Sequence, residues 1–281
     1  MKHIPVLLDA VMRELGDLRG HAVLDATFGA GGYSRAFLAA GANVVAFDRD
    51  PHVVSDANAL QQEYGDRFRF IQKPFSFMDE LDEQFDAIVF DLGISSMQID
   101  IPERGFSFRT DAPLDMRMSS DGMSAADLIA TSSQSELAGI LREYGDVQKA
   151  NVLARAIIQA QPKTTFALRD LIYNPRDIAP VFQALRIAVN DEMGEIKRAL
   201  ATVPKLLKPN GKCLVVTFHS LEDRIVKQVF HDWTTVAGNP HIPVAELAPF
   251  RLIRAITPTT GELENNPRAR SAHMRGVQKS Y

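Results

Sequence analysis

Short apolar runs alternate with helical patterns in the first third of the chain. Four of these runs, each bounded by glycine, proline or aspartate, are predicted strands: 21–26, 42–48, 67–71 and 85–91. The segments 34–40 and 51–64 carry apolar residues at helical spacing and lie between strands. Alternation of this kind is typical of βαβ units. The sequence therefore predicts an α/β domain with a mostly parallel sheet.

The alternation of strand and helix patterns ends after Asp91, because the next clear strand pattern is 212–218. A crossover between parallel strands needs only about a dozen residues, so the roughly 120 residues in between are far too many. Most of them have helical patterns: 124–130, 134–144, 148–160, 167–172 and 181–207. We therefore expect an inserted, mainly helical subdomain at 99–194, within a Rossmann-like domain formed by 1–98 and 195–281.

Composition indicates an ordinary soluble protein of 281 residues, of which 46% are hydrophobic and 23% charged. The first residues lack a charged leader followed by an apolar core, and no stretch approaches about 18 uninterrupted apolar residues. We therefore expect a cytoplasmic location without membrane contact. The formal charge is −4, yet six Arg or Lys stand against two Glu between Arg251 and Tyr281. This basic tail is compatible with a polyanionic binding partner.

The single cysteine, Cys213, lies in the apolar run 211–218. A lone cysteine cannot form an internal disulfide and has no partner for a cysteine-based metal site. No basic or histidine cluster flanks it, so we expect a buried strand thiol rather than a reactive nucleophile. The sequence thus predicts a reducing compartment and no metal cofactor.

A glycine-rich turn follows the first predicted strand. The string Asp-Ala-Thr-Phe-Gly-Ala-Gly-Gly-Tyr-Ser occupies 25–34 and leads into a helix. Nucleotide-like ligands bind at this position in open α/β sheets, because glycines let the backbone approach them. Gly29 and Gly31 match the first two glycines of the dinucleotide-binding motif, but Ser34 stands where that motif needs Gly or Ala. The loop alone is weak support for any one ligand.

Asp48 ends the second predicted strand, 19 residues after Gly29. A carboxylate at this place accepts hydrogen bonds from both hydroxyls of a ribose. The alternative is an aspartate that caps the turn at 48–51. We favour ribose binding because the loop and the acid occur together, and together they predict an adenosyl ligand.

Two further residues follow neighbouring strands and are expected to line the same crevice. Phe75 follows the third predicted strand and is a candidate to cover an adenine, although Phe77 competes for that role and Phe75 is equally well explained as core. Asp91 ends the fourth strand and is expected to face the amino acid part of the ligand or the acceptor.

Nine strings in order along nearly the whole chain closely resemble the ribosomal RNA small subunit methyltransferase H family. They occupy 3–6, 25–32, 47–51, 91–96, 103–108, 113–118, 182–192, 218–226 and 266–272. The resemblance implies a class I methyltransferase that transfers methyl from S-adenosylmethionine to N4 of a cytidine in the decoding region of 16S rRNA. By position, it also implies cofactor contacts at Gly31, Gly32, Tyr33, Asp48, Phe75, Asp91 and Gln98.

The sequence departs from that family at three places. Members commonly carry His at the position of Tyr33 and Gly at the position of Ala112. The segment 173–181 is short and lacks the basic signature that usually precedes the string at 182–192. This departure puts RNA docking through the segment 173–181 in question. It does not change the prediction of the cofactor site.

The sulfonium already activates the methyl group, so alignment and exclusion of water are the main tasks of the protein. The cytosine amine has a delocalised lone pair, which an acceptor for one N4 hydrogen would localise. We predict that Asp91, or a carbonyl in the turn 91–94, is that catalytic acceptor.

The partner is expected to be 16S rRNA or the small ribosomal subunit, with the target base unstacked. The residues predicted to contact RNA are Arg104, Arg109, Arg117, Asn190, His219, Arg268 and Arg270. Scattered arginines are often solvated or salt-bridged, so we expect about half of them to matter. Two of the others have structural alternatives: a hydrogen bond from His219 to Ser220 or Asp223, and a polar helix face at Asn190.

Two other classes of protein remain as alternatives. An NAD-dependent oxidoreductase is disfavoured by the missing third glycine. The shortened segment 173–181 is compatible with the second alternative, a non-catalytic RNA-binding module that kept the fold.

Overall fold

The computed structural model describes residues 5–235 and 248–281, so His3 and Ile4 of the first family string lie outside the described residues. The chain forms two compact units, 1–93 with 193–281, and 94–192. The subdomain expected at 99–194 begins five residues later and ends two residues later than the second unit.

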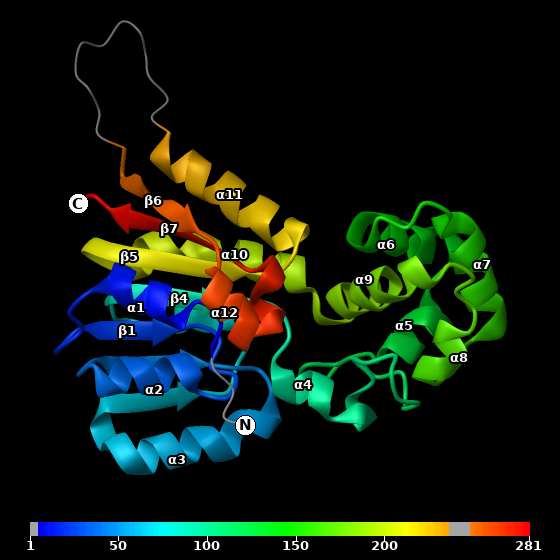
Figure 1. The fold of residues 1–281 in the computed structure, drawn as a ribbon, viewed down its shortest axis with the longest axis horizontal. Helices are drawn as coiled ribbons and strands as arrows, with labels where there is room; N and C mark the ends of the chain where they lie inside the picture. The colour runs from blue at the N-terminus through cyan, green and yellow to red at the C-terminus, as the bar shows by residue number, and fades with distance from the viewer. Residues whose placement is uncertain (1–4, 236–247) are drawn as a thin grey trace, which may run out of the picture. The chain divides into compact units, whose positions relative to one another are not determined.

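The first unit contains a seven-stranded sheet in the order β3-β2-β1-β4-β5-β7-β6 (Figure 1). The strands are β1 (Ala22–Asp25), β2 (Asn43–Phe47), β3 (Phe68–Ile71), β4 (Phe85–Asp91), β5 (Leu207–Thr217), β6 (Phe250–Ile256) and β7 (His273–Lys279). The first five are parallel, and β7 runs antiparallel to both β5 and β6. The expected mostly parallel sheet is therefore present.

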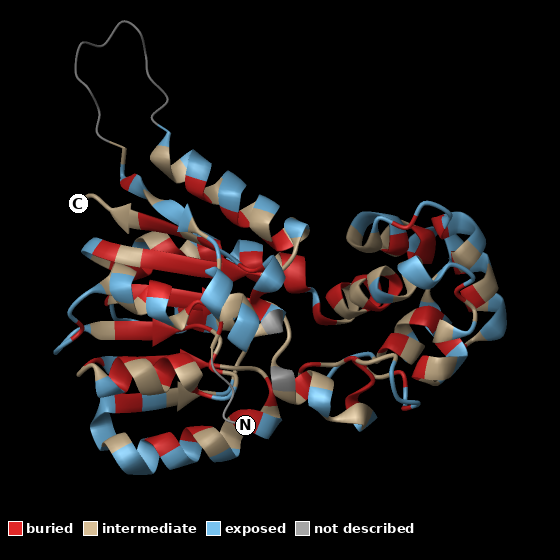
Figure 2. Cartoon of the chain, in the orientation of Figure 1, coloured by how far each residue is buried: buried red, intermediate tan, exposed pale blue. Residues whose placement is uncertain are grey.

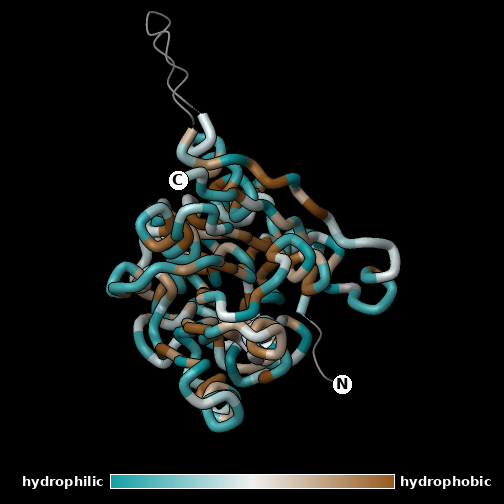
Figure 3. Tube along the Cα trace, turned by 90° about the vertical axis from the view of Figure 1, so that its left-hand side faces the viewer, coloured by the Kyte–Doolittle hydropathy of each residue, from teal (hydrophilic) through white to brown (hydrophobic). Residues whose placement is uncertain are grey.

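The central strands are buried on both faces. Val23 and Leu24 in β1, Ile88 and Val89 in β4 and Leu214 in β5 are fully inaccessible to solvent. This explains why these strands are continuous apolar runs rather than alternating ones. Figure 2 shows the buried residues concentrated along β1, β4 and β5, and Figure 3 shows hydrophobic and hydrophilic stretches alternating along the trace. Cys213 is buried in β5, as expected, and burial raises the pKa of its thiol.

The helices of the first unit pack on this sheet. They are α1 (Leu8–Leu15), α2 (Gly32–Ala39), α3 (Val54–Tyr64), α10 (Glu192–Leu206, which starts at the last residue of the second unit), α11 (Ser220–Thr234) and α12 (Thr260–Asn265). Four short 3-10 helices are η1 (Pro51–Val53), η2 (Gly65–Arg67), η3 (Phe75–Glu80) and η6 (Pro267–Ser271). Helix α2 contacts β1 and β2, α3 contacts β3, and α11 contacts β5, β6 and β7.

The second unit is mainly helical. Its helices are α4 (Ser96–Asp100), η4 (Pro102–Arg104), α5 (Ala125–Thr131), α6 (Gln134–Gly145), α7 (Ala150–Ala160), α8 (Thr165–Arg169), η5 (Pro175–Asp177) and α9 (Ile178–Asn190). Leu137, Ile157 and Leu185 belong to its own fully buried core. A separate apolar core is what lets such an insert fold as a unit of its own.

Three features differ from the sequence-based expectations. The helix predicted at 181–207 is interrupted at Asp191, whose φ of 47° ends α9 before α10 begins. The strands β6 and β7 were not predicted: β6 has mixed outward residues without an apolar run or strict alternation, and β7 is interrupted by Gly276. Helices α1, α4, α11 and α12 were also not predicted. Within the described part of the chain, none of the helices combines the length and apolarity that a membrane crossing needs.

Candidate active site

Three aspartates lie at the carboxyl edge of the sheet. Asp25 is the last residue of β1, Asp91 is the last of β4, and Asp48 directly follows β2. The strand order reverses between β1 and β4, where Asp25 is paired in register with Val89. Ligands of open α/β sheets bind at such a switch point, so this edge is the candidate active site.

The glycine-rich turn presents its backbone at this edge. Gly29 and Gly31 have φ of 53° and 74°, a left-handed conformation that favours glycine. A Cβ on Gly31 would lie 2.8 Å from Cζ of Phe28, and one on Gly32 would collide with Pro5. The turn therefore requires glycine at 31 and 32, where the sequence predicted cofactor contacts.

Asp48 connects the glycine-rich turn to the turn after β2. Its Oδ2 accepts a hydrogen bond from the Gly29 N–H at 2.8 Å, and its Oδ1 accepts one from the Asp50 N–H at 2.9 Å. The second bond is the cap of the turn at 48–51 that was considered as the alternative for Asp48, while η1 is capped by Asp50, whose side chain accepts the His52 N–H. Burial raises the pKa of Asp48 to about 6, although the two N–H groups oppose the shift.

Ser34 explains why the third glycine is missing. It lies in the first turn of α2, and its hydroxyl donates to Oδ2 of Asp25 at 2.6 Å. Both residues are buried, and burial raises the pKa of Asp25 to about 6 despite this bond. Sequence reasoning missed Asp25 as a site residue. The signal was present, because Asp25 ends its strand as Asp48 and Asp91 end theirs.

Asp91 carries a buried oxygen that the described residues do not satisfy. Its backbone N–H donates to the Thr27 hydroxyl oxygen at 2.6 Å, but its side-chain Oδ1 has no hydrogen-bond partner in the described part of the chain. Burial raises the pKa of Asp91 well above its ordinary value, and the charges of Asp25 and Glu222 add to the effect. A buried acceptor without a partner at a switch point fits a polar group of a bound ligand.

The two candidate phenylalanines lie in different surroundings. Phe75 opens η3, is half-buried and packs edge-on against Phe90 of β4 with ring centroids 5.7 Å apart. Phe77 is 43% exposed and lies beneath the ammonium of Lys73. Phe75 is therefore held against the central strand, while Phe77 faces solvent. The adenine contact stays a prediction, and this geometry favours Phe75.

Two other predicted cofactor residues use their side chains for packing or capping. Tyr33 is 3% exposed and its hydroxyl donates to the Val6 carbonyl. Any contact from Tyr33 to the cofactor is therefore expected to come from its backbone. Gln98 belongs to the second unit, where its Oε1 accepts the Ser95 N–H at 2.9 Å in the capping box of α4. Its cofactor contact stays a prediction.

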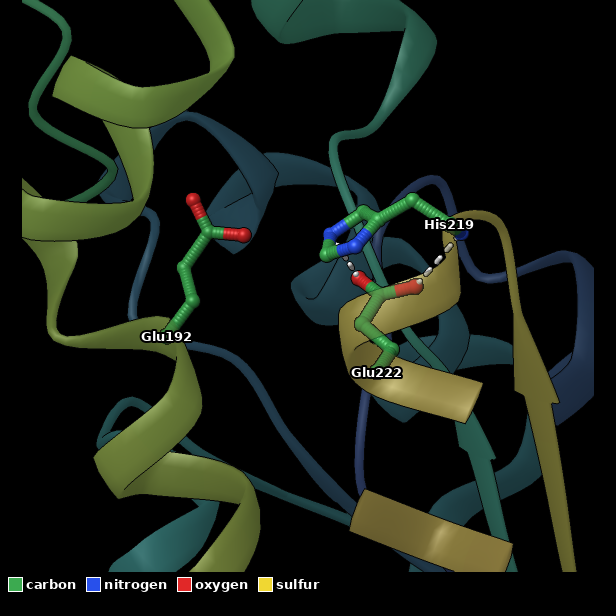
Figure 4. Close-up of side chains that lie close together, drawn as sticks. All are labelled: Glu192, His219 and Glu222. Carbon is green, nitrogen blue, oxygen red and sulfur yellow. Dashed lines mark hydrogen bonds and ion pairs between the residues drawn. The ribbon is translucent and has the colours of Figure 1, made fainter. Parts of the chain in front are cut away.

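His219 lies at the start of α11, just beyond β5, and pairs with neither of the partners considered from the sequence. Its Nε2 lies 3.0 Å from Oε1 of Glu222, within ion-pair range (Figure 4). Glu222 is 1% exposed, and its Oε2 also accepts the backbone N–H groups of Phe218 and His219. The structural alternative for His219 therefore involves Glu222, and Asp223 pairs with Arg275 instead. The RNA contact of His219 stays a prediction. Glu192, also drawn in Figure 4, pairs with Arg186 at 2.7 Å.

Three of the residues predicted to contact RNA hold the second unit together. Arg104 is 9% exposed and donates to the carbonyls of Arg117 and Met118, both at 3.0 Å. Arg117 forms a two-pronged pair with Asp115 at 2.8 and 2.7 Å. Asn190 is 2% exposed and bonds to the backbone of Met116 and Met118. These contacts favour structural roles for all three.

The remaining predicted RNA contacts are exposed arginines. They are Arg109 in the second unit, and Arg268 and Arg270 in η6 of the first. Exposed guanidinium groups are suited to phosphate binding. Their RNA contacts stay predictions.

The model of the MraW methylase family matches residues 1–280. The chain belongs to the MraW methylase family. Curated relatives cover nearly the whole chain. A protein of Mesorhizobium japonicum named ribosomal RNA small subunit methyltransferase H is 47% identical over 99% of this chain and 87% of its own length. Proteins of the same name from Granulibacter bethesdensis and Rhizobium johnstonii are 46% and 44% identical, over 98% and 100% of this chain and 91% and 88% of their own lengths.

Membership of this family confirms the expected class I methyltransferase fold, the enzyme class and the resemblance inferred from the nine strings. S-adenosylmethionine is the cofactor, and the residues at the sheet edge fit it. Glycine backbone lies beside a buried carboxylate at Asp48 for the sugar, and Asp91 offers an unsatisfied oxygen nearby in the same unit. The alternative of an NAD-dependent oxidoreductase is set aside.

Proposed function

We propose that this protein transfers a methyl group to the exocyclic N4 of a cytidine in the decoding region of 16S rRNA, in the cytoplasm. The name shared by its relatives and the family-specific strings support ribosomal RNA as the substrate. The single observation that carries the reaction is the unpartnered Oδ1 of Asp91, buried where the strand order reverses.

Residues of the first unit position the reactants. S-adenosylmethionine supplies, when bound, a methyl group that its sulfonium makes electrophilic. Asp48 accepts hydrogen bonds from the ribose hydroxyls, and the backbone of Gly31 and Gly32 lies against the ligand. Phe75 covers the adenine from the side of β4. These contacts hold the donor in line for attack and exclude water.

Asp91 acts on the acceptor. The lone pair of N4 is delocalised into the cytosine ring, and a hydrogen bond from N4–H to Oδ1 of Asp91 localises it for attack. Burial and neighbouring carboxylates raise the pKa of Asp91, which makes it a stronger proton acceptor than an ordinary aspartate. It would thereby take the proton that N4 loses when the new bond from N4 to the methyl carbon replaces the bond of that carbon to sulfur, which would leave with the electron pair.

Exposed arginines in each unit are the proposed RNA contacts. Arg109 in the second unit, and Arg268 and Arg270 in the first, offer exposed guanidinium groups to phosphates, and the second unit serves substrate recognition. The partner is 16S rRNA or the small ribosomal subunit. Whichever is used, the cytidine has to leave its stack to reach the carboxyl edge.

Two measurements test the proposal. Mass spectrometry of rRNA from cells with and without this protein is expected to show one N4-methylcytidine that depends on it. Asp91→Asn is expected to lower kcat by about 100-fold, in the range of a lost general base. The exposed Asp66→Asn is the matched control. Unchanged turnover in Asp91→Asn would remove the assigned role.

A further inference from the structure

A groove of about 460 Å³ lies on the first unit, between α11 and the strands β6 and β7. Its lining includes Arg224, Lys227 and His231 from α11, Leu252 and Ile253 from β6, and Arg275 from β7. Figure 1 shows α11 alongside β6, which is the edge strand of the sheet. None of the residues in the active site described above lines it.

One wall of the groove is cationic. Arg224, Lys227 and His231 are exposed and spaced three and four residues apart, so they lie on one face of α11. Arg275 is paired with Asp223 through two hydrogen bonds of 2.7 and 2.8 Å, so its charge is already balanced. No aspartate or glutamate is among the described residues that line the groove. Arg224 and Lys227 therefore give it a net positive charge.

The opposite wall is apolar. Leu252 is 61% exposed on the edge strand, which is unusual for a large aliphatic side chain. The buried Phe230 of α11 also lines the groove. A cationic wall facing an apolar wall matches a nucleotide, whose phosphate needs charge and whose base needs an apolar surface.

The groove begins next to the carboxyl edge of the sheet. Helix α11 starts at Ser220, directly after the end of β5, and Arg224 lies about one turn further on. From Arg224 to His231 the helix rises by about 10 Å. A strand of RNA lying in the groove would therefore lead toward the end of β5.

We propose that this groove binds a single-stranded RNA segment that adjoins the reacting nucleotide. Phosphates pair with Arg224 and Lys227, and a base packs on Leu252. The proposal rests on the proposed function for its polyanionic occupant. Charge complementarity favours RNA over a symmetric contact with the same groove of a second copy, because that contact would place the like charges of Arg224 and Lys227 together.

The test uses the double variant Arg224→Gln with Lys227→Gln and a fluorescein-labelled single-stranded fragment of 16S rRNA. We expect roughly tenfold weaker binding by fluorescence anisotropy at moderate salt. The slope of log affinity against log salt is expected to fall by about 1.4, or about 0.7 for each lost phosphate contact. KM for rRNA is expected to rise in parallel, while the calorimetric Kd for S-adenosylmethionine is unchanged.

The matched control is the double variant Lys197→Gln with Lys205→Gln, two exposed lysines of α10 with the same change in charge. Equal weakening in both variants would overturn the proposal, because it would show a general charge effect. Unchanged RNA affinity in the groove variant, while the wild type methylates rRNA, would overturn the groove and leave the function standing. RNA binding that depends on the groove, in a wild-type protein that does not methylate rRNA, would overturn the proposed function and leave the groove standing.

A second variant separates RNA from self-association. Leu252→Asp is expected to weaken RNA binding without changing the mass measured by sedimentation. If it instead dissociates a dimer and leaves RNA affinity unchanged, the surface is an interface between copies of the chain and the proposal is wrong.

Discussion

Ser34 donates a hydrogen bond of 2.6 Å to Asp25, which joins the first turn of α2 to the end of β1 across the glycine-rich turn. Both side chains are almost completely buried. The pair replaces the close glycine packing of a dinucleotide-binding turn with a buried polar contact. It also satisfies one oxygen of a carboxyl group that would otherwise be costly to bury.

Ser34→Ala is expected to destabilise the protein by about 1–3 kcal/mol, because the buried carboxyl group of Asp25 loses the hydrogen bond from the Ser34 hydroxyl. Ser34→Gly restores the motif glycine and is expected to be at least as destabilising. Urea unfolding measures both, with the exposed Ser55→Ala in α3 as control. Wild-type stability in Ser34→Gly would show that close packing, and not the hydrogen bond, is what position 34 provides.

The alternation of apolar runs made the first four parallel strands predictable, because buried parallel strands have a strong pattern. The last two strands were not predictable in the same way. β6 is at the sheet edge and exposes Arg251, Leu252 and Arg254, so its sequence carries no period of two. β7 is interrupted by Gly276, where a Cβ would lie 2.6 Å from Leu214. The pairing partner, and not the local sequence, determines both.

The positions of the predicted cofactor residues in the fold follow more directly from the sequence than the surroundings of the predicted RNA contacts. Asp48 and the glycine-rich turn are adjacent to strand ends, so their positions follow from the parallel sheet. Arg104 and Asn190 look like surface residues by type, yet their polar groups satisfy backbone atoms inside the second unit. Such contacts depend on segments far apart in sequence, and residue type alone does not reveal them.

The affinity for S-adenosylmethionine is expected to depend on pH through Asp48. The ribose hydroxyls donate to its charged form, and its pKa is raised to about 6 by burial. Affinity is therefore full about one pH unit or more above this pKa and is lost as pH falls through it, by about tenfold per pH unit well below the pKa. Calorimetry between pH 5 and about 7.5 measures this dependence.

Asp48→Asn is the matched variant for that measurement. It is expected to bind at least about tenfold more weakly at pH 7.5, as for a lost hydrogen bond to a charged group, and to lose the dependence below pH 6. The exposed Asp66→Asn keeps both the affinity and its pH dependence. If Asp48→Asn retained the wild-type affinity and pH dependence, a group other than Asp48 would have to accept the hydrogen bonds of the ribose hydroxyls.

Gly31→Ala is expected to weaken the cofactor site because of both strain and space. The φ of Gly31 is 74°, and an added Cβ would meet the Phe28 ring. We expect about 1 kcal/mol or more of lost stability and a clear rise in the Kd for S-adenosylmethionine. Gly16 has a similar φ of 79°, but an added Cβ there would have no atom within 4 Å. Gly16→Ala therefore measures the effect of backbone strain alone, away from the site. Equal Kd values in the two variants would contradict a role for the turn in binding.

Asn190→Ala separates a structural role from an RNA contact. The Asn190 carboxamide accepts the Met118 N–H at 2.8 Å and donates to the carbonyls of Met116 and Arg186 at 2.8 and 2.9 Å. Removing it leaves buried backbone groups unsatisfied, so we expect a loss of about 3 kcal/mol in stability.

Urea unfolding and RNA binding of the fraction that remains folded distinguish the two roles, with the exposed Asn151→Ala of α7 as control. If Asn190 is structural, its variant unfolds at lower urea and the folded protein binds RNA with wild-type affinity. A stable variant with weakened RNA binding would instead mean that the carboxamide turns outward when RNA is bound, because a 2% exposed side chain has no other way to reach it.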